Sequence, residues 1–350
     1  MNLSSLGRCI DQPLILTELQ KKMPQFLIGT AGAYGIYDTY SSTKGQSVSV
    51  KKKKALKNFI IISTTVAASL IGAKGLKLFK KQIVPPLLQA FDKKEILLNN
   101  EIAVKNYIKA ENPSEKIKEI LHKTKSGPLS YKDTNTILND LPDTKERRKL
   151  LSVLLPEPEK LDAKGIFSEI GRLSLLGAIP VIGGVLGGIT ADKVTDTSSK
   201  KSIANKIKEG FYQYFANIFL CNVGACAALF TAEKLQKTGL IKTLSPIKKM
   251  LVILTGITAT GIVGGSYIAN KMSQKLIDPL FETNKKKKLL NKGRDKKNLY
   301  YERKPEAADI ALHIDDIATA GVLSGFKWIE PALPMMYFVS GYRAGIGYRN

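Results

Sequence analysis

Residues 173–191 read LSLLGAIPVIGGVLGGITA, an uncharged and glycine-rich apolar stretch in a chain that is otherwise rich in lysine. A helix needs roughly 20 predominantly apolar residues to cross about 30 Å of hydrocarbon. Two further stretches of spanning length, residues 210–232 and 250–270, also carry no formal charge. Together the three stretches predict an all-α, polytopic integral membrane protein.

Other apolar segments bring the expected number of transmembrane helices to about four or five. Residues 58–73 are uncharged and lie between Lys57 and Lys74, whose long side chains can reach the membrane surface. Residues 317–342 are apolar but interrupted by charged residues and prolines, so we expect a broken span there. Residues 24–40 are short for a span and rich in Tyr, which favours the membrane–water boundary. We expect this last segment to lie at the interface or to re-enter the membrane.

Changes in composition divide the chain into six segments. Ahead of the long apolar runs, apolar residues at helical spacing, such as Ile117, Ile120 and Leu121, predict a small helical soluble part. The predicted segments are an N-terminal tail with the interfacial or re-entrant piece (1–54), a first transmembrane helix (55–79), a helical soluble segment (80–166), a glycine-rich three-helix transmembrane region (167–271), a basic linker (272–304), and a C-terminal amphipathic helix with a broken membrane segment (305–350).

The net charge of +24 indicates which partners the chain attracts. Most of the positive charge comes from Lys, whereas Arg is the usual residue for bidentate recognition of phosphates and bases. A Lys beside a membrane gains roughly 1 kcal/mol from anionic headgroups. We therefore expect anionic membrane lipids as partners, and we do not expect nucleic acid.

The distribution of Lys and Arg also predicts an orientation. With four spans, the N-terminal tail, residues 193–208 and residues 271–304 lie on one side of the membrane, and these segments hold most of the basic residues that flank the spans. Basic loops stay in the cytoplasm by the positive-inside rule. The sequence thus predicts a multi-pass protein with a cytoplasmic N-terminus.

Small residues four apart mark the faces at which helices are expected to meet. Within a membrane, helices associate through close backbone approach, which small residues permit. The same spacing serves contacts within one chain and contacts between copies, so a homo-oligomer stays open. The predicted helix-packing residues are Gly183, Gly184, Gly187, Gly188, Gly261 and Gly265.

One acidic stripe could bind a cation. Glu306, Asp309, His313 and Asp316 follow one another at spacings of three, four and three, which places all four on one face of a helix. Carboxylates with a His can ligate a divalent metal or relay protons. In a chain this basic, however, an acidic face more simply neutralises neighbouring Lys, so no metal site is favoured.

Lys327 and Glu330 form a second group of interest because they are ionisable residues inside the last apolar region. Ionisable residues at membrane depth are costly and often belong to a solute or ion pathway. The prolines that follow also fit a helix end at the membrane surface, and we favour this second interpretation.

No catalytic grouping can be read from the sequence. It contains no phosphate-binding Gly-Lys-Ser/Thr loop, nucleophile elbow, His-Glu-x-x-His motif or paired Cys-x-x-Cys motifs. We therefore expect no enzyme activity and no cofactor, and no small-molecule substrate can be identified.

The leading hypothesis is a non-catalytic, membrane-integral scaffold or envelope protein. It would self-associate through its Gly-rich helix faces and bind anionic lipid through its Lys-rich flanks. The alternative is a solute or ion pathway protein that uses Lys327, Glu330 and the acidic stripe. A third hypothesis is a basic, membrane-tethered protein that binds acidic partners.

Overall fold

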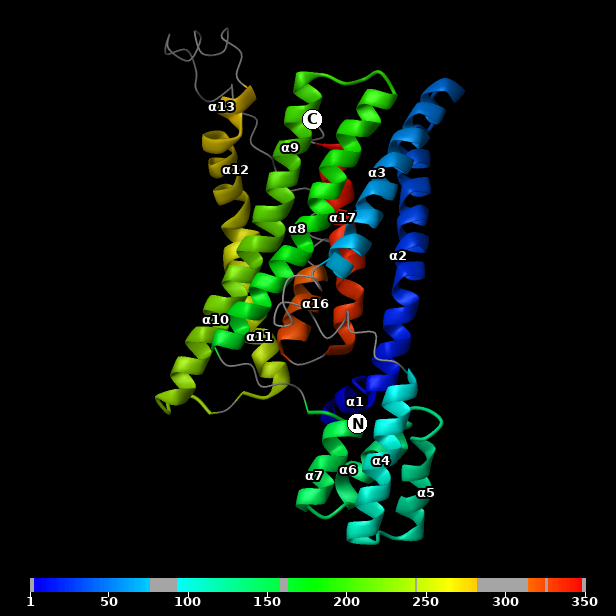
Figure 1. Cartoon of the computed structure of the whole chain (residues 1–350). Coiled ribbons are helices and arrows are strands. Elements are labelled where there is room, and N and C mark those ends of the chain that lie inside the picture. Colours follow the sequence, from blue (N-terminus) through cyan, green and yellow to red (C-terminus); the bar gives the residue numbers. More distant parts are fainter. Residues whose placement is uncertain are drawn as a thin grey trace. The chain divides into compact units, whose positions relative to one another are not determined.

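The computed structural model describes residues 3–75, 93–157, 163–242, 244–281, 314–324 and 327–347. Every regular element within these ranges is a helix (Figure 1). The all-α prediction is therefore confirmed for the described part of the chain.

The chain divides into two compact units. The first comprises residues 1–24, 85–161 and 321–331, and the second comprises residues 25–84, 162–320 and 332–350. Helix α2 (Pro13–Ser42) contributes to both, because its part up to Pro24 belongs to the first unit and the rest to the second.

The first unit is a small helical bundle. It contains α1 (Leu3–Ile10), α4 (Lys93–Glu111), α5 (Glu115–Lys123), α6 (Tyr131–Asp140) and α7 (Lys145–Leu154). Its core is a single apolar cluster that includes Tyr107, Leu121, Ile137 and Leu150. Helices α6 and α7 begin at capping residues, because the side chains of Ser130 and Thr144 accept hydrogen bonds from backbone N–H groups three residues on. The apolar residues at helical spacing and the capping residues thus explain, from local sequence, why the helices of this unit form.

The N-terminal residues are bonded into the first unit. The Gln12 side chain donates through Nε2 to the backbone oxygen of Leu129 (2.9 Å) and accepts through Oε1 from its N–H (2.7 Å). The Arg8 guanidinium donates to the backbone oxygen of Leu155 at 2.6 and 3.0 Å. Residues that composition alone assigned to a tail are therefore fixed against α6 and α7.

Helix α8 (Ala163–Val194) is the central element of the second unit. It packs against α3 (Val48–Gly75), α9 (Lys200–Tyr214) and α17 (Leu333–Ile346), as well as α10 (Leu220–Lys237). The remaining elements of the second unit are the π-helix η3 (Phe215–Phe219), α11 (Pro246–Ile257), the π-helix η4 (Thr258–Val263), α12 (Gly265–Leu276) and α13 (Asp278–Phe281). The residues of α16 (Ile314–Leu323) and of the 3₁₀-helix η6 (Lys327–Ala332) are divided between the two units.

Two helical stretches among the described residues are long and apolar enough to cross a membrane: Ile170–Val194 and Lys200–Lys237. They contain the first two uncharged runs of the sequence. Length and composition would also admit the buried core helices of a soluble protein, so these stretches support membrane association weakly. The third run, residues 250–270, is divided among α11, η4 and α12.

Residues 24–40, for which we expect an interfacial or re-entrant piece, lie within the continuous helix α2. Leu27 and Ala31, four residues apart, are buried in a cluster with residues of α3 and α17. Tyr34, three residues further on, makes an edge-to-face contact with Tyr342 of α17 at a centroid distance of 5.2 Å. This packed face stabilises a helix whose sequence alone is short for a span.

The first pair of α8 glycines faces α3. A Cβ atom at Gly183 would overlap the Ala68 side chain and lie 3.1 Å from the backbone oxygen of Thr64. A Cβ atom at Gly187 would overlap the Thr64 side chain. Here the small residues allow close approach between two helices of the same chain.

The second pair of α8 glycines faces α17. A Cβ atom at Gly184 would overlap the carbonyl oxygen of Gly341, and one at Gly188 would overlap the carbonyl oxygen of Gly345. Gly341 and Gly345 are themselves four residues apart, so two small-residue pairs pack against each other. Helix α8 thus uses two neighbouring faces to contact two different helices.

Gly261 and Gly265 lie where the segment η4–α12 approaches η3 and α10. A Cβ atom at Gly261 would overlap the Cys221 side chain, and one at Gly265 would lie 3.2 Å from the backbone oxygen of Ala216. Thr260 reinforces this contact, since its hydroxyl donates to the backbone oxygen of Leu220 at 2.8 Å. These predicted packing residues therefore also contact helices of their own chain.

Replacing Gly184 with Leu should separate α8 from α17, because the new side chain has no space beside the Gly341 backbone. Overpacking costs about 3 kcal/mol, with the rigid backbone contact placing this site at the upper end of the usual range. The midpoint of thermal unfolding of the purified protein in detergent measures the loss. Gly171→Leu on the same helix is the control, because a Cβ atom at Gly171 meets nothing within 4 Å. Equal midpoints for the two variants would contradict the packing.

Candidate functional site

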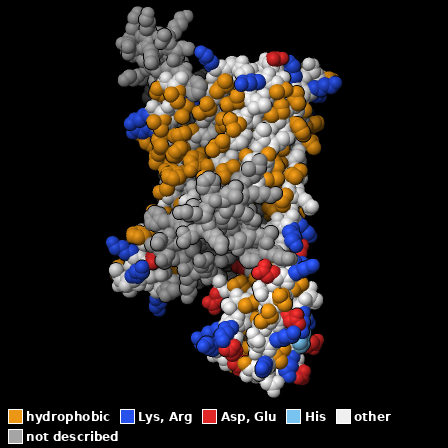
Figure 2. All heavy atoms as spheres, in the orientation of Figure 1, with side chains coloured by type: hydrophobic (Ala, Val, Ile, Leu, Met, Phe, Trp, Pro, Cys, Tyr) orange, Lys and Arg blue, Asp and Glu red, His pale blue; other side chains and the backbone are white. Residues whose placement is uncertain are grey.

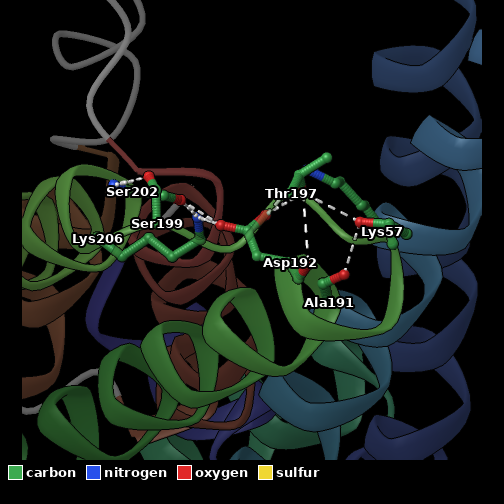
Figure 3. Close-up of polar contacts among 8 residues, drawn as sticks. Lys57, Ala191, Asp192, Thr197, Ser199, Ser202 and Lys206 are labelled. Carbon is green, nitrogen blue, oxygen red and sulfur yellow. Dashed lines mark hydrogen bonds and ion pairs between the residues drawn. The ribbon is translucent and has the colours of Figure 1, made fainter.

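A buried ion-pair cluster, which we name the Asp192 cluster, joins three helices near the C-terminal end of α8 (Figure 3). The Asp192 carboxylate accepts from Lys57 Nζ of α3 at 2.9 Å and from Lys206 Nζ of α9 at 2.5 Å. It also accepts a hydrogen bond from the Ser202 hydroxyl. The side chains of Asp192 and Lys206 are only 6% exposed, whereas Lys57 is 25% exposed. One carboxylate thus pairs with two ammonium groups from different helices.

Local structure holds Asp192 in place. The turn after α8 is closed by a hydrogen bond from the Thr197 N–H to the Asp192 backbone oxygen at 2.9 Å. Helix α9 begins at Ser199, whose side chain accepts from the Ser202 N–H at 3.0 Å. This cap orients the first turn of α9, so that Ser202 and Lys206, four residues apart, face Asp192 together.

A second buried carboxylate, Asp38 of α2, has partners on two other helices. Asp38 Oδ2 is 3.1 Å from Lys54 Nζ and accepts from Asn58 Nδ2 at 3.0 Å, both from α3. The Tyr342 hydroxyl of α17 donates to the same oxygen at 3.1 Å. Asp38 therefore joins α2, α3 and α17 in the way that Asp192 joins α3, α8 and α9.

A ladder of polar side chains continues along α9 into η3. Gln213 Nε2 donates to Glu209 Oε1 at 2.8 Å, and Asn217 Nδ2 donates to Gln213 Oε1 at 2.9 Å. All three side chains are buried, and they follow Lys206 on one helix face. Asn217 lies within the π-helix η3, and single π-helical turns inside longer helices are frequent at functional sites.

The role of these buried polar and charged side chains depends on whether the second unit is surrounded by water or by lipid. Burying a charge is costly, and a buried pair returns that cost only when its geometry and hydrogen bonds are good. Inside a bilayer, buried ionisable groups usually pair with one another or line a path for ions or solutes. The Asp192 cluster fits a helix-joining role, whereas the Glu209 ladder also fits a path. Within the described residues, no three His, Cys, Asp or Glu side chains lie close enough to hold a metal ion.

The residues predicted as an acidic stripe cannot be placed. Glu306, Asp309 and His313 lie outside the described residues, and for Asp316 only the backbone, in α16, is described. For Lys327 likewise only the backbone, in η6, is described, while Glu330 is buried in the same helix. The predicted stripe and the predicted pair of Lys327 with Glu330 therefore stay predictions.

Neither the Asp192 cluster nor the ladder that begins at Glu209 was predicted from the sequence. Lys206, Glu209, Gln213 and Asn217 recur at spacings of three, four and four, which places them on one helix face at the start of an apolar run. That pattern could have identified the ladder. Asp192 gave no such signal, because its partners Lys57 and Lys206 come from distant parts of the chain.

Comparison with known proteins gives no relative from which a role could be transferred. No protein-family model, curated protein or solved structure matches the chain. The function must therefore be inferred from the geometry of the site.

Replacing Asp192 with Asn should destabilise the second unit by about 3 kcal/mol, because Lys206 would be left buried without a countercharge. We take the lower end of the range for breaking a buried pair, since Lys57 is a quarter exposed and can turn to solvent. Thermal unfolding in detergent measures the effect. Asp196→Asn is the matched control, because Asp196 is exposed just after α8 and its positive φ of 53° suits Asn equally well. A shift as large in the control as in Asp192→Asn would remove the special role of the buried pair.

Proposed function

We propose that this protein is a multi-pass membrane scaffold without catalytic activity, which binds anionic lipid at its Lys-rich end. The observation that carries the proposal is an inverted distribution of polarity in the second unit. Asp38, Asp192 and Lys206 are buried, while Ile36 and Phe59 are 74% and 68% exposed. Burial of charges with exposure of large apolar side chains fits a unit surrounded by lipid.

The exposed apolar residues extend over several helices. In Figure 2, hydrophobic side chains gather on the upper part of the visible face, and Lys and Arg side chains border them at its top edge. Large exposed apolar side chains of this unit come from α2, α3, α8 and α10 and include Phe26, Ile28, Ile36, Tyr37, Phe59, Ile182, Leu186, Val223 and Phe230. In water, a surface of this kind would promote aggregation or require a partner, whereas a bilayer covers it.

Two turns at one end of the second unit are rich in lysine. The turn between α2 and α3 carries Lys44 and is followed by Lys51–Lys54, and the turn between α8 and α9 is bordered by Lys193, Lys200 and Lys201. Both turns lie at the same end of the unit, where Lys57 and Lys206 share Asp192 (Figure 1). At a membrane surface, this end would attract anionic headgroups.

The contacts of the N-terminal residues support a topology that differs from the one expected from the sequence. Because Gln12 is hydrogen-bonded to Leu129, both residues lie on the same side of any membrane, and the chain between them crosses it an even number of times. If α3 crosses, we take α2 as the second crossing. The Lys-rich turn between them is then cytoplasmic by the positive-inside rule. The N-terminus would lie on the opposite side, in contrast to the sequence-based expectation, which did not count α2 as a span.

Self-association through the predicted glycine faces receives less support. The glycines of α8 contact α3 and α17 within the same chain. We therefore assign their packing to the fold of the monomer and leave oligomerisation out of the proposal.

A solute or ion pathway is the second candidate function. The Glu209–Gln213–Asn217 ladder favours it, because it places hydrogen-bonding groups along a helix inside an apolar unit and enters a π-helical turn. A path for protons or small cations would need such groups.

Reconstitution into liposomes separates the two functions. A scaffold should co-purify with anionic lipid in preference to phosphatidylcholine and give no ion or proton flux above that of empty vesicles. A pathway protein should give flux that Glu209→Gln lowers at least tenfold, while Glu101→Gln in the first unit leaves it unchanged. Flux with these properties would overturn the scaffold proposal. Absence of any preference for anionic lipid would overturn the lipid-binding part.

A further inference from the structure

A groove with a cavity volume of about 920 Å³ opens between α2 and α3 in the second unit. Its walls are apolar side chains from both helices, including Ile28, Ile36, Phe59 and Val66. Gly32 lies along the groove, and a Cβ atom there would meet nothing within 4 Å. The groove is therefore open space that the protein's own side chains do not fill.

One end of the groove is polar and cationic. Thr39 lines it from the last turn of α2, Thr43 and Lys44 line it from the turn that follows, and Lys51 lines it from the start of α3, with Asn58 further along α3. Since α2 and α3 are consecutive helices joined by a short turn, these residues meet at one end, with Ile28 and Val66 at the other. Lys44 and Lys51 are exposed, and no carboxylate of the described residues pairs with either.

The dimensions suit an acyl chain. From Lys51 to Val66, α3 rises about 22 Å at 1.5 Å per residue. One leaflet of the hydrocarbon core is about 15 Å thick, half of the roughly 30 Å of the whole core. A groove that begins at two lysines and continues between apolar walls can therefore accept one chain of a lipid along its length.

We propose that this groove binds a phospholipid with an anionic headgroup, one acyl chain lying between α2 and α3 and the phosphate lying between Lys44 and Lys51. The inference rests on the proposed membrane location and gives the lipid binding of the proposed function a defined site. Charge complementarity selects the lipid over a second copy of the chain. Two copies in one membrane would bring their Lys51–Lys54 runs together at the same depth, where like charges repel.

Gly32→Leu tests the acyl part of the site, because the new side chain enters the groove without striking the protein. Gly29→Leu is its matched control: Gly29 lies one turn earlier on α2, its Cβ would also meet nothing within 4 Å, and it does not line the groove. Lys44→Gln with Lys51→Gln tests the headgroup part. Lys52→Gln with Lys53→Gln is the control, since these two exposed lysines lie outside the groove.

The readout is the number of phosphatidylglycerol or phosphatidylcholine molecules retained by the full-length protein in native mass spectrometry from mixed micelles. We expect one tightly held phosphatidylglycerol, displaced by Gly32→Leu and held roughly 25-fold more weakly by the Lys44/Lys51 variant, at about fivefold for each lysine. Both controls should retain it.

Equal retention by Gly32→Leu and Gly29→Leu would overturn the groove while leaving the general preference for anionic lipid intact. If the wild type shows no such preference, the proposed lipid binding itself fails. Retention of phosphatidylcholine as tight as that of phosphatidylglycerol would overturn the headgroup assignment. A dimer that Gly32→Leu dissociates would replace the lipid with a second copy.

Discussion

The proposed membrane topology depends on two hydrogen bonds between the Gln12 side chain and the backbone of Leu129. They are made by a buried amide that finds both a donor and an acceptor on one residue, so losing them would leave buried polar groups unsatisfied. They also close a loop that contains α2 and α3. In a membrane, a stretch of chain whose two ends are held on the same side must cross the membrane an even number of times. A crossing by α3 therefore requires a second crossing, which α2 can supply.

The second unit depends on a complementary set of contacts around α8. Gly183 and Gly187 admit α3, and Gly184 and Gly188 admit α17, so the backbones approach more closely than larger side chains would allow. The Asp192 cluster then fixes α3 and α9 at the C-terminal end of the same helix. The small residues allow the helices to lie close together, and the buried ion pair fixes how they are positioned along one another. The outer surface keeps its large apolar side chains, which is the property on which the proposed membrane role and the lipid groove both depend.

Much of the fold could be predicted from the sequence, because the responsible signals are local. The uncharged runs predicted the all-α class, and those at residues 173–191 and 210–232 lie within the two helical stretches of the described residues that are both long and apolar enough to cross a membrane. The span predicted at residues 250–270 is not one regular α-helix, because the π-helix η4 interrupts it. The helix across residues 24–40 was not predicted, since its stability comes from packing of Leu27 and Ala31 against distant helices.

The candidate site could be predicted only in part, because its members are distant in sequence. Asp38 is paired with residues of α3 and α17, and Asp192 with residues of α3 and α9. No local pattern indicates which Lys a solitary carboxylate will find. The glycine pairs were recognisable from their spacing, but only the structure shows that their contacts are made within one chain.

The most direct test of the account is the side of the membrane on which three positions lie. Single cysteines at Ser47 and Ser126, both exposed, would be placed in a protein without Cys9, Cys221 and Cys226, and an N-terminal epitope tag would be added. Impermeant thiol reagent and antibody would then be applied to sealed vesicles of each orientation. The account predicts that Ser47 reacts only from the cytoplasmic side, and that Ser126 and the tag are reached only from the opposite side. Ser126 and the tag on different sides, or Ser47 and Ser126 on the same side, would contradict the paired crossing of α2 and α3.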